Sequence, residues 1–512
     1  MKPRPDYFSD DRPPRRRPAK KRPPRKSATE RRSERASKPD RPRQDRPTLV
    51  PRTARQLAFY LLQEGDLLGE RERGGQPPLF ATERLESAFT EFALSPEDRR
   101  LAQELLNGTI RRKGTLDILL SDCCQRPLKE LELELVWLMR LGAYQLVYLD
   151  AIPDHAAVNE TVDVARWYDK QRWCQFLNGN LRSVSRLLAA TEVIGPATDT
   201  LPTRDGHFRS LTKPLFADPR HEPQRYLSET QSFPGWLLDR WSKQYDFDEL
   251  ARLCQWFNAP APLFLRVNSR KTNRNELLSQ FEQAEVAAEA GSLDNSIRMR
   301  KSYAIRNLPG FDEGLFTVQD ETPQRVCSLL NAQPGEAVWD MCAAPGTKST
   351  CLAEAMNNQG TLLATDINAT RLKRVQENAR RLELSIIKTD VLPDNPPYAI
   401  RVQFDAILID APCSNTGVLG KRSEARWRLR SDDINELARI QRHLLGAALT
   451  FLKPGGRIVY ATCSIEPEEN ELQVRQFLQG HRDLELQSEE KFTPGQPADG
   501  GYAALITRRT DS

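Results

Sequence analysis

Two cysteines stand out because each follows a short apolar run and begins a turn rich in small residues. Cys413 lies in the stretch "DAPCSNTG", which starts at Asp410, and Cys463 lies in "YATCSIEPEENE". A metal site would need more ligands, but none of the five histidines lies beside these motifs, so we expect no metal. The nine cysteines include no CxxC pair, which disfavours a disulfide framework or a zinc ribbon. The remaining alternatives are two small core residues and a pair of reactive thiols.

One reaction needs two thiols and a carboxylate beside a flat ring. The C5 carbon of a pyrimidine becomes nucleophilic only after a thiolate has added at C6. An acid must support the charge at N3, and Asp410 stands three residues before Cys413. After methyl transfer the C5 proton must leave, and a second thiol could accept it directly or through water. The residues are therefore a complete set for methylating C5, and their spacing leaves open which thiol takes which role.

The elements that would position these residues follow one pattern from residue 312 onward. Apolar strands alternate with helices, and the strands are "AVWDM", "GTLLAT", "SIIKT", "FDAILI" and "GRIVYAT". This alternation predicts a doubly wound, mostly parallel α/β sheet of the Rossmann-like kind. Such sheets bind ligands beyond the carboxyl ends of their strands. Asp366, Asp390, Asp410 and both cysteines lie at or just after such ends, which predicts a site there.

The turn after the first strand, "DMCAAPGTK", indicates which ligand the sheet binds. It has neither the G-x-G-x-x-G spacing of a dinucleotide site nor the glycine that precedes the lysine of a Walker A loop. Ala343, Ala344 and Gly346 would let a ligand approach the backbone closely. Asp366 suits the hydroxyls of a ribose, and Asp390 suits an adenine amino group. An adenosine site without a phosphate cradle predicts S-adenosyl-L-methionine; the alternative is that these aspartates only cap helices.

The N-terminal segment, residues 1–49, differs in composition from the rest of the chain. It carries 18 Lys/Arg against 7 Asp/Glu and ten prolines, within a chain of net charge +5. We expect this tail to be disordered and to bind a polyanion, RNA or DNA rather than a membrane; a merely solubilising extension is the alternative. No apolar run reaches the ~20 residues that span a bilayer. Free thiols and the lack of an apolar leader predict a reducing, cytoplasmic compartment.

Between the tail and the predicted sheet we expect three further segments. Residues 50–190 show helical spacing throughout and predict an all-helical domain. Residues 191–225 are rich in Pro, Gly and Asp and predict an irregular linker. Residues 226–311 combine strand and helix patterns and predict a small α/β unit, before the domain at 312–512.

Two charged stretches near the cysteines have more than one interpretation. "GKRSEARWRLR" surrounds Trp427 with basic residues, which suits RNA phosphates and a stacked base; the alternative is a basic loop with Trp427 packed inward. "EPEENE" is interpreted as the acidic first turn of a helix, where charge and dipole agree, and receives no catalytic role.

The stretches "DMCAAPGTK", "DAPCSNTG" and "ATCSIEPEEN" resemble the three signature motifs of the NOL1/NOP2/Sun family of RNA 5-methylcytosine methyltransferases. The resemblance implies that Cys463 is the nucleophile and that Cys413 promotes product release. It also places Lys348 and Asp410 among the catalytic residues. The cofactor pocket that it implies is lined by Cys342, Ala343, Ala344, Pro345, Gly346, Thr347, Lys348, Asp366, Asp390 and Asp410.

The resemblance extends over about residues 50–512. "LFLRVN" and "LPGFDEGLFTVQDE" are similar to the small RNA-binding subdomain of the family, and "RLGAYQLVYLDAIPDHAAVNETVDVAR" with "FLNGNLR" is similar to the antitermination factor NusB. This layout resembles that of the bacterial members that methylate one cytosine of 16S ribosomal RNA. Two departures are Thr347, where the family usually has Gly, and "DGGY" at 499–502, where it usually has D-G-F-F.

The sequence thus predicts a multidomain enzyme, monomeric, that uses S-adenosyl-L-methionine to methylate C5 of a cytosine in RNA, with 16S rRNA as the favoured substrate. Its predicted fold is a NusB-like all-α domain, a small α/β RNA-binding subdomain and a Rossmann-like methyltransferase domain. A tRNA enzyme and a non-catalytic RNA-binding factor of the antitermination kind are the alternatives; intact Cys413, Cys463, Asp410 and Lys348 argue against the second.

Overall fold

The computed structural model describes residues 49–64, 68, 80–193, 195–203, 207–301, 303–393 and 398–510. The expectation for the basic tail at 1–49 falls almost entirely outside these residues.

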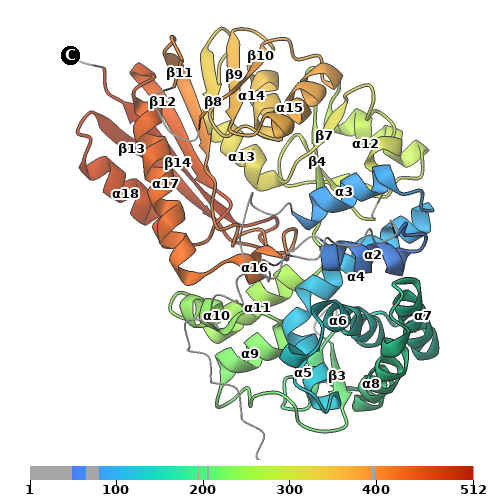
Figure 1. Cartoon of the computed structure of the whole chain (residues 1–512). Helices are drawn as coiled ribbons and strands as arrows, with labels where there is room; N and C mark the ends of the chain where they lie inside the picture. The colour runs from blue at the N-terminus through green and yellow to red at the C-terminus, as the bar shows by residue number, and fades with distance from the viewer. Residues whose placement is uncertain are drawn as a thin grey trace, which may run out of the picture. The chain divides into compact units, whose positions relative to one another are not determined.

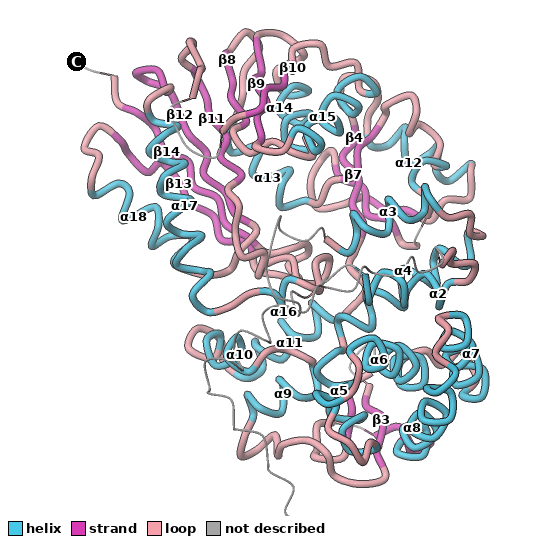
Figure 2. Tube along the Cα trace, in the orientation of Figure 1, coloured by secondary structure: helices cyan, strands magenta, loops and turns pink. Residues whose placement is uncertain are grey.

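The N-terminal part of the described residues is helical, as predicted, and we call it the helical domain (Figure 2). The α-helices are α2 (Ala54–Glu64), α3 (Ala81–Glu91), α4 (Pro96–Arg111), α5 (Lys113–Cys123), α6 (Leu133–Tyr148), α7 (Asp154–Trp167) and α8 (Cys174–Leu187). Ser95 starts helix α4 because its side chain accepts a hydrogen bond from the Asp98 amide, and Pro96 at the first position has no N–H that would lack an acceptor. Helix α6 is buried along almost its whole length, so it forms the centre of this domain.

The segment 191–225, predicted to be an irregular linker, contains more regular structure than expected. Three short strands, β1 (Leu188–Val193), β2 (Thr200–Pro202) and β3 (Phe208–Leu211), form an antiparallel sheet in the order β1-β3-β2. Strands of three to six residues with few apolar positions leave almost no periodic signal, which explains the difference. Three helices follow: α9 (Pro223–Gln231), α10 (Gly235–Trp241) and α11 (Phe247–Asn258).

A small four-stranded sheet comes next, in the order β5-β6-β4-β7. Its elements are β4 (Leu263–Val267), α12 (Arg274–Gln283), β5 (Ala288–Ala290), β6 (Ser296–Met299) and β7 (Phe316–Val318). The α/β character is as predicted, but β7 lies beyond residue 311 and pairs with β4, so the small sheet takes its last strand from the segment assigned to the next domain.

The C-terminal sheet has seven strands in the order β10-β9-β8-β11-β12-β14-β13 (Figure 1). Its first five strands are parallel and the last two antiparallel, so the predicted doubly wound, mostly parallel sheet is confirmed. The strands are β8 (Ala337–Asp340), β9 (Thr361–Asp366), β10 (Ile387–Val391), β11 (Phe404–Asp410), β12 (Leu452–Thr462), β13 (Leu484–Phe492) and β14 (Gly501–Arg508).

Helices cover both faces of this sheet and create two cores. One core joins the sheet to α13 (Glu321–Leu330), α14 (Thr347–Ala355) and α15 (Ala369–Arg381). The other joins it to α17 (Ser431–Leu449) and α18 (Glu471–Gln479), which lie together on the opposite face in Figure 1. Because successive residues of a strand point to opposite faces, strands between two cores are apolar throughout, and this is the pattern that the sequence displays.

The basic stretch that contains Trp427 packs inward, so the RNA-stacking interpretation of this residue is wrong. Its segment forms the short helix α16 (Ala425–Arg428), and the Trp427 indole N–H donates to the Ile110 carbonyl at 2.8 Å. Arg426 is fully buried and donates to the Phe257 carbonyl at 3.2 Å and to Asn258 Oδ1 at 3.0 Å. These acceptors lie in the last turns of α4 and α11, where carbonyls lack donors from their own helix. The stretch therefore caps two helix ends.

Candidate active site

Parallel pairing brings the ends of three central strands to one edge of the sheet. Asp410, the last residue of β11, pairs with Ala461 of β12, and Leu408 pairs with Asp340, the last residue of β8. Cys463 follows β12 directly. The turns that carry both cysteine motifs therefore start at the same edge, which is where a sheet of this kind binds its ligand.

The two cysteine turns contact one another through backbone and sulfur. The Sγ atoms of Cys413 and Cys463 lie 3.2 Å apart, and both residues are free thiols. The Gly417 amide donates to the Cys463 carbonyl at 3.0 Å. A Cβ atom at position 417 would lie 2.5 Å from the carbonyl oxygen of Gly500, so only glycine fits this close backbone approach. The sequence predicted both cysteines at strand ends, and the structure brings them together.

The surroundings of the two sulfurs differ, and so do their proton affinities. The hydrogen bond with Cys413 lowers the pKa of Cys463 despite burial, and the charges of Arg422 and Lys348 lower it further. The same hydrogen bond, together with burial, raises the pKa of Cys413 well above its ordinary value, and the Glu469 charge adds to this rise. A pair that shares one proton thus holds it on Cys413, and Cys463 has the greater thiolate character.

An ion pair lies beside the thiols. Lys348 Nζ donates to Asp410 Oδ2 at 2.6 Å, and both side chains are partly exposed. Burial alone would lower the pKa of Lys348, but the Asp410 carboxylate more than offsets this and raises it, so the amine is charged. The charges of Lys348 and Cys463 stabilise each other. A charged donor and a carboxylate therefore lie next to the more acidic of the two thiols.

The loop from Cys342 to Lys348 connects β8 to α14 and packs on the end of β9. The Ala343 amide donates to the Thr365 carbonyl at 2.8 Å, and the Ala344 amide points at Asp366 Oδ2 at 3.3 Å. Gly346 has a φ of +99°, and a Cβ atom there would lie 2.9 Å from Val375 Cγ1. The glycine is thus required by its backbone angle and by packing against α15. The sequence had assigned it only to close approach of a ligand.

The structure places Thr347, the first residue of α14, beside an arginine from the small sheet. The Thr347 carbonyl accepts from Arg266 Nη1 at 3.0 Å, while Arg266 forms two further bonds with the Glu354 carboxylate. Arg266 is 4% exposed, so this cluster is buried. Its contact with the main chain fixes the start of α14, and with it the turn that carries Lys348.

Asp366 and Asp390 occupy neighbouring strand ends, with Asp366 paired to Val391. Asp366 is almost fully buried and accepts from the Asn368 amide at 2.9 Å, whereas Asp390 is exposed. Each aspartate is followed by an exposed apolar side chain: Ile367 is 64% exposed and Val391 is 47% exposed. Sequence reasoning missed these two residues. An apolar residue directly after a strand-end aspartate could have marked them, because a purine ring needs apolar contact.

No group of three or more side chains suitable for a metal ion occurs within the described part of the chain. Its helices include none that is long and apolar enough to cross a membrane.

Comparison with known proteins agrees with this geometry over most of the chain. Residues 327–506 match the model of the 16S rRNA methyltransferase RsmB/F family, residues 52–186 match the NusB family, and residues 233–306 match the RsmF/B-like ferredoxin-like domain. The chain is 34% identical over 462 residues to the probable ribosomal RNA small subunit methyltransferase B of Synechocystis sp., which covers 89% of this chain and 95% of that protein.

It is also 35% identical over 419 residues to the ribosomal RNA small subunit methyltransferase B of Proteus mirabilis, with 81% of this chain and 92% of that protein covered. The chain belongs to the ribosomal RNA small subunit methyltransferase B family. The crystal structure of the protein PH0851 is similar as well, at 25% identity and a TM-score of 0.71 over 88% of this chain and 98% of that one. The resemblance found in the motifs is thereby confirmed, as is the NusB-like domain.

Asp340 lies at the same strand edge, and sequence reasoning did not single it out. It is fully buried at the end of β8, and Ser349 Oγ donates to its Oδ2 at 2.6 Å. Its Oδ1 atom is buried and has no hydrogen-bond partner among the described residues. Burial raises the pKa of Asp340 to about 7, and the nearby Asp410 charge adds to the rise. A buried carboxylate oxygen without a donor is suited to a cationic ligand.

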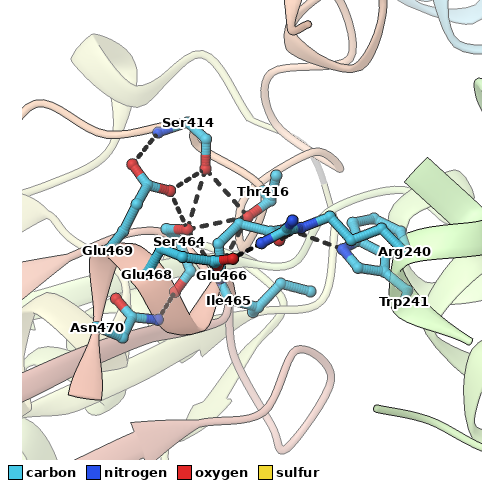
Figure 3. Close-up of polar contacts among 10 residues, drawn as sticks. All are labelled: Arg240, Trp241, Ser414, Thr416, Ser464, Ile465, Glu466, Glu468, Glu469 and Asn470. Atoms are coloured by element: carbon cyan, nitrogen blue, oxygen red, sulfur yellow. Dashed lines mark hydrogen bonds and ion pairs between the residues drawn. The ribbon is translucent and has the colours of Figure 1, made fainter. Parts of the chain in front are cut away.

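The "EPEENE" stretch was interpreted as the acidic first turn of a helix. Its last glutamate, Glu471, does lie in the first turn of α18, but two of the others have a different environment. Glu466 and Glu469 are both fully buried, and Figure 3 shows the side chains that they contact. Glu466 pairs with Arg240 of α10 and accepts from the Trp241 indole N–H at 2.9 Å. Glu469 accepts from residues of both cysteine turns. Consecutive glutamates before a helix resemble a favourable first turn, so their burial could not be read from the stretch itself.

Proposed function

We propose that this methyltransferase uses S-adenosyl-L-methionine to methylate C5 of a cytosine in 16S rRNA through a covalent bond between Cys463 and C6. The observation that carries the proposal is the pair of free thiols, 3.2 Å apart, at the strand end where Lys348 and Asp410 form an ion pair. The substrate class rests on the names of the relatives, which are small-subunit ribosomal RNA methyltransferases.

The residues at the strand ends fit the cofactor. Asp366 would hold the ribose hydroxyls, and the exposed Ile367 and Val391 side chains would contact the adenine. Asp340 would hold the amino group of the methionine part, because its buried Oδ1 atom needs a donor. Asp390, exposed at the end of β10, would accept from the adenine amino group. When bound, S-adenosyl-L-methionine supplies an electrophilic methyl group.

The remaining loop residues would form the wall of the same pocket. The Cys342–Lys348 loop lies between the ends of β8 and β9, so its small residues border the space above the sheet edge. Thr347 stands where the family usually has glycine; its carbonyl is fixed by Arg266, and its side chain is partly exposed.

Cys463 begins the reaction because its thiolate is the more favoured of the two. Its sulfur adds to C6, and the electrons of the C5–C6 double bond move toward C5 and N3. Lys348 stabilises the negative charge that develops on the ring by passing a proton through the Asp410 carboxylate to N3, and the proton returns by the same route when the C5–C6 double bond re-forms. The base must leave its stack to present one face to the sulfur.

Cys413 completes the reaction by removing the C5 proton. Its pKa is raised by the hydrogen bond with Cys463, by burial and by the charge of Cys463. Once Cys463 is bonded to carbon, that charge is gone, so Cys413 can lose its own proton to water and act as a base. It then takes the proton from C5, the double bond re-forms, and the Cys463–C6 bond breaks. The two thiols thus act in sequence.

The two single alanine variants test this assignment. Cys463→Ala should abolish methylation and form no adduct, because no nucleophile remains. Cys413→Ala should add and transfer the methyl group but fail to release the RNA, so a denaturation-resistant complex carrying label from methyl-labelled cofactor should accumulate. A denaturing gel of both variants with 16S rRNA decides the matter. An adduct in Cys463→Ala alone would reverse the roles, and an active Cys463→Ala enzyme would end the thiol mechanism.

Bisulfite sequencing of total RNA from a deletion strain tests the substrate. A 5-methylcytosine lost from 16S rRNA supports the proposal, and one lost from tRNA contradicts it. An unchanged pattern in every RNA would favour a non-catalytic binding factor.

A further inference from the structure

The two cysteine turns are joined by a buried carboxylate (Figure 3). Glu469 is fully buried, and its Oε2 atom accepts hydrogen bonds from the hydroxyls of Ser414 and Ser464, the second at 2.5 Å. Its Oε1 atom accepts from the Ser414 amide and from Gln441 Nε2, both at 2.9 Å. Ser414 follows Cys413 and Ser464 follows Cys463, so one side chain fixes the residue after each thiol.

The hydroxyl groups around this carboxylate form one closed cluster. Ser414 Oγ lies 3.0 Å from Ser464 Oγ, and Thr416 Oγ1 lies 3.1 Å from Ser464 Oγ. Thr416 Oγ1 also accepts from the Ile465 amide at 3.1 Å. The cluster therefore joins residues 414–416 to residues 464–465 by side chains as well as by backbone. If either turn moved alone, these hydrogen bonds would break.

The number of donors indicates the charge of Glu469. Burial raises the pKa of Glu469, and the bonds from Ser414, Ser464 and Gln441 oppose that rise. Two hydroxyls, one amide N–H and one side-chain amide are all directed at the two oxygens, which is the arrangement that stabilises an ionised carboxylate. The negative charge lies on the side of Cys413, whose thiolate it disfavours.

The other charges that face the thiols lie closer to Cys463. Arg422 and Lys348 favour its thiolate, while Asp410, paired with Lys348, opposes it. Arg422 also donates to Asn415 Oδ1 at 3.0 Å, and the same oxygen accepts from the Cys463 thiol at 3.3 Å, a contact that opposes the effect of these cations. Cations on one side and a buried anion on the other thus polarise the pair in a single direction.

We propose that Glu469 is the positioning residue that sets the roles of the two thiols: it holds both cysteine turns together and keeps their shared proton on Cys413. The inference rests on the proposed function for its catalytic meaning, but the arrangement of the proton is a property of the free protein. The position of Glu469 also explains why Cys413, which has a high proton affinity, lies beside Cys463, which has a low one.

Alkylation of the free protein tests the proposal without RNA or cofactor. The two cysteines lie in different tryptic peptides, residues 402–421 and 458–475, so iodoacetamide labelling of each can be followed by mass spectrometry. In the wild-type protein Cys463 should react faster than Cys413 between pH 7 and pH 9. In Glu469→Gln the ratio of the two rates should fall about tenfold, because removal of a neighbouring charge lowers the proton affinity of Cys413.

Glu466→Gln is the matched control. It makes the same change in the same turn, at a buried carboxylate that contacts Arg240 and Trp241. Its rate ratio should equal that of the wild type. Equal ratios in Glu469→Gln and Glu466→Gln would overturn the proposal, whether or not the enzyme methylates RNA. Conversely, a lowered ratio in Glu469→Gln alone would support it even if the substrate assignment failed.

Turnover measurements separate positioning from binding. Glu469→Gln should lower kcat while the KM for S-adenosyl-L-methionine stays unchanged, because Asp366 and its neighbours are not altered. If Glu469→Gln does not fold, Ser464→Ala decides: it removes one hydroxyl donor and should lower kcat about tenfold at unchanged KM for both substrates. A folded Ser464→Ala enzyme with the kcat of the wild type would overturn the proposal.

Discussion

Arg426 should be the residue through which the segment after the Cys413 turn contributes most to the stability of the end of α11. Its guanidinium is fully buried, and burial lowers its pKa well below the usual value. It donates to acceptors at the ends of two helices, and its cation lies 4.0 Å from the centre of the Phe233 ring. Replacement by methionine keeps much of the length of the side chain but removes every donor.

The size of the effect follows from the bonds that are lost. Two are short, to Asn258 Oδ1 at 3.0 Å and to the Phe257 carbonyl at 3.2 Å. Three are longer, between 3.3 and 3.5 Å, to the carbonyls of Ser232, Leu419 and Arg111. A hydrogen bond with a charged partner contributes about 1.5–3 kcal/mol, and the long contacts contribute little. Arg426→Met should therefore cost about 3–5 kcal/mol of local stability.

Hydrogen exchange read by mass spectrometry measures this cost where it occurs. Amides in the last turn of α11 should exchange about a hundredfold faster or more in Arg426→Met, since each 1.4 kcal/mol is a factor of ten. The end of α4, reached only by the 3.5 Å contact with the Arg111 carbonyl, should change little. Arg430→Met, an exposed arginine of the same basic stretch, is the control and should exchange like the wild type. Unchanged exchange at the end of α11 in a folded Arg426→Met protein would refute the reasoning.

Two further predictions concern the cofactor pocket. Asp366→Ala should weaken S-adenosyl-L-methionine binding by about 1.5–3 kcal/mol, because the proposed ribose contact is lost; unchanged affinity in calorimetry would remove Asp366 from the site. Asp340→Asn should stabilise the free protein by about 4 kcal/mol at pH 8, since burial holds the pKa of Asp340 at about 7 in the folded state, about three units above its ordinary value. Unfolding then releases the proton of Asp340 between about pH 4 and pH 7, so the gain should grow over that range and level off above it; thermal melts in which the gain shrinks as pH rises would contradict this.

The strand ends of the catalytic sheet could be predicted from the sequence because the signals are local. Each apolar run lies between two cores, and a polar residue at its end marks the end of the strand, as Asp366 and Asp410 do. Parallel order then brings those ends to one edge without further information. For the same reason Cys413 and Cys463 could be paired from their positions alone.

Features that depend on contacts between distant residues could not be predicted in this way. Glu469 lies in a stretch that suits an exposed helix start, and its burial depends on Ser414, which is 55 residues away along the chain. Trp427 stands in a basic stretch, yet its indole N–H donates to a carbonyl of α4 that lies 317 residues earlier in the chain. Strand β7 has only three residues, and its partner β4 is separated from it by two other strands along the chain. Charge and periodicity record the neighbours in sequence, and these positions are decided by neighbours in space.

The 3.2 Å separation of the two sulfur atoms also bears on how the enzyme tolerates oxidants. A disulfide bond is about 2.0 Å long, so a shift of about 1 Å would bring the sulfurs to bonding distance. Peroxide would oxidise the more ionised Cys463 first, and Cys413 would then displace water from the resulting sulfenic acid. One two-electron oxidation would thereby remove the proposed nucleophile and the proposed base together, and a cellular dithiol would restore both. Purification and assays therefore need a reductant, and the activity of the enzyme should follow the redox poise of its compartment.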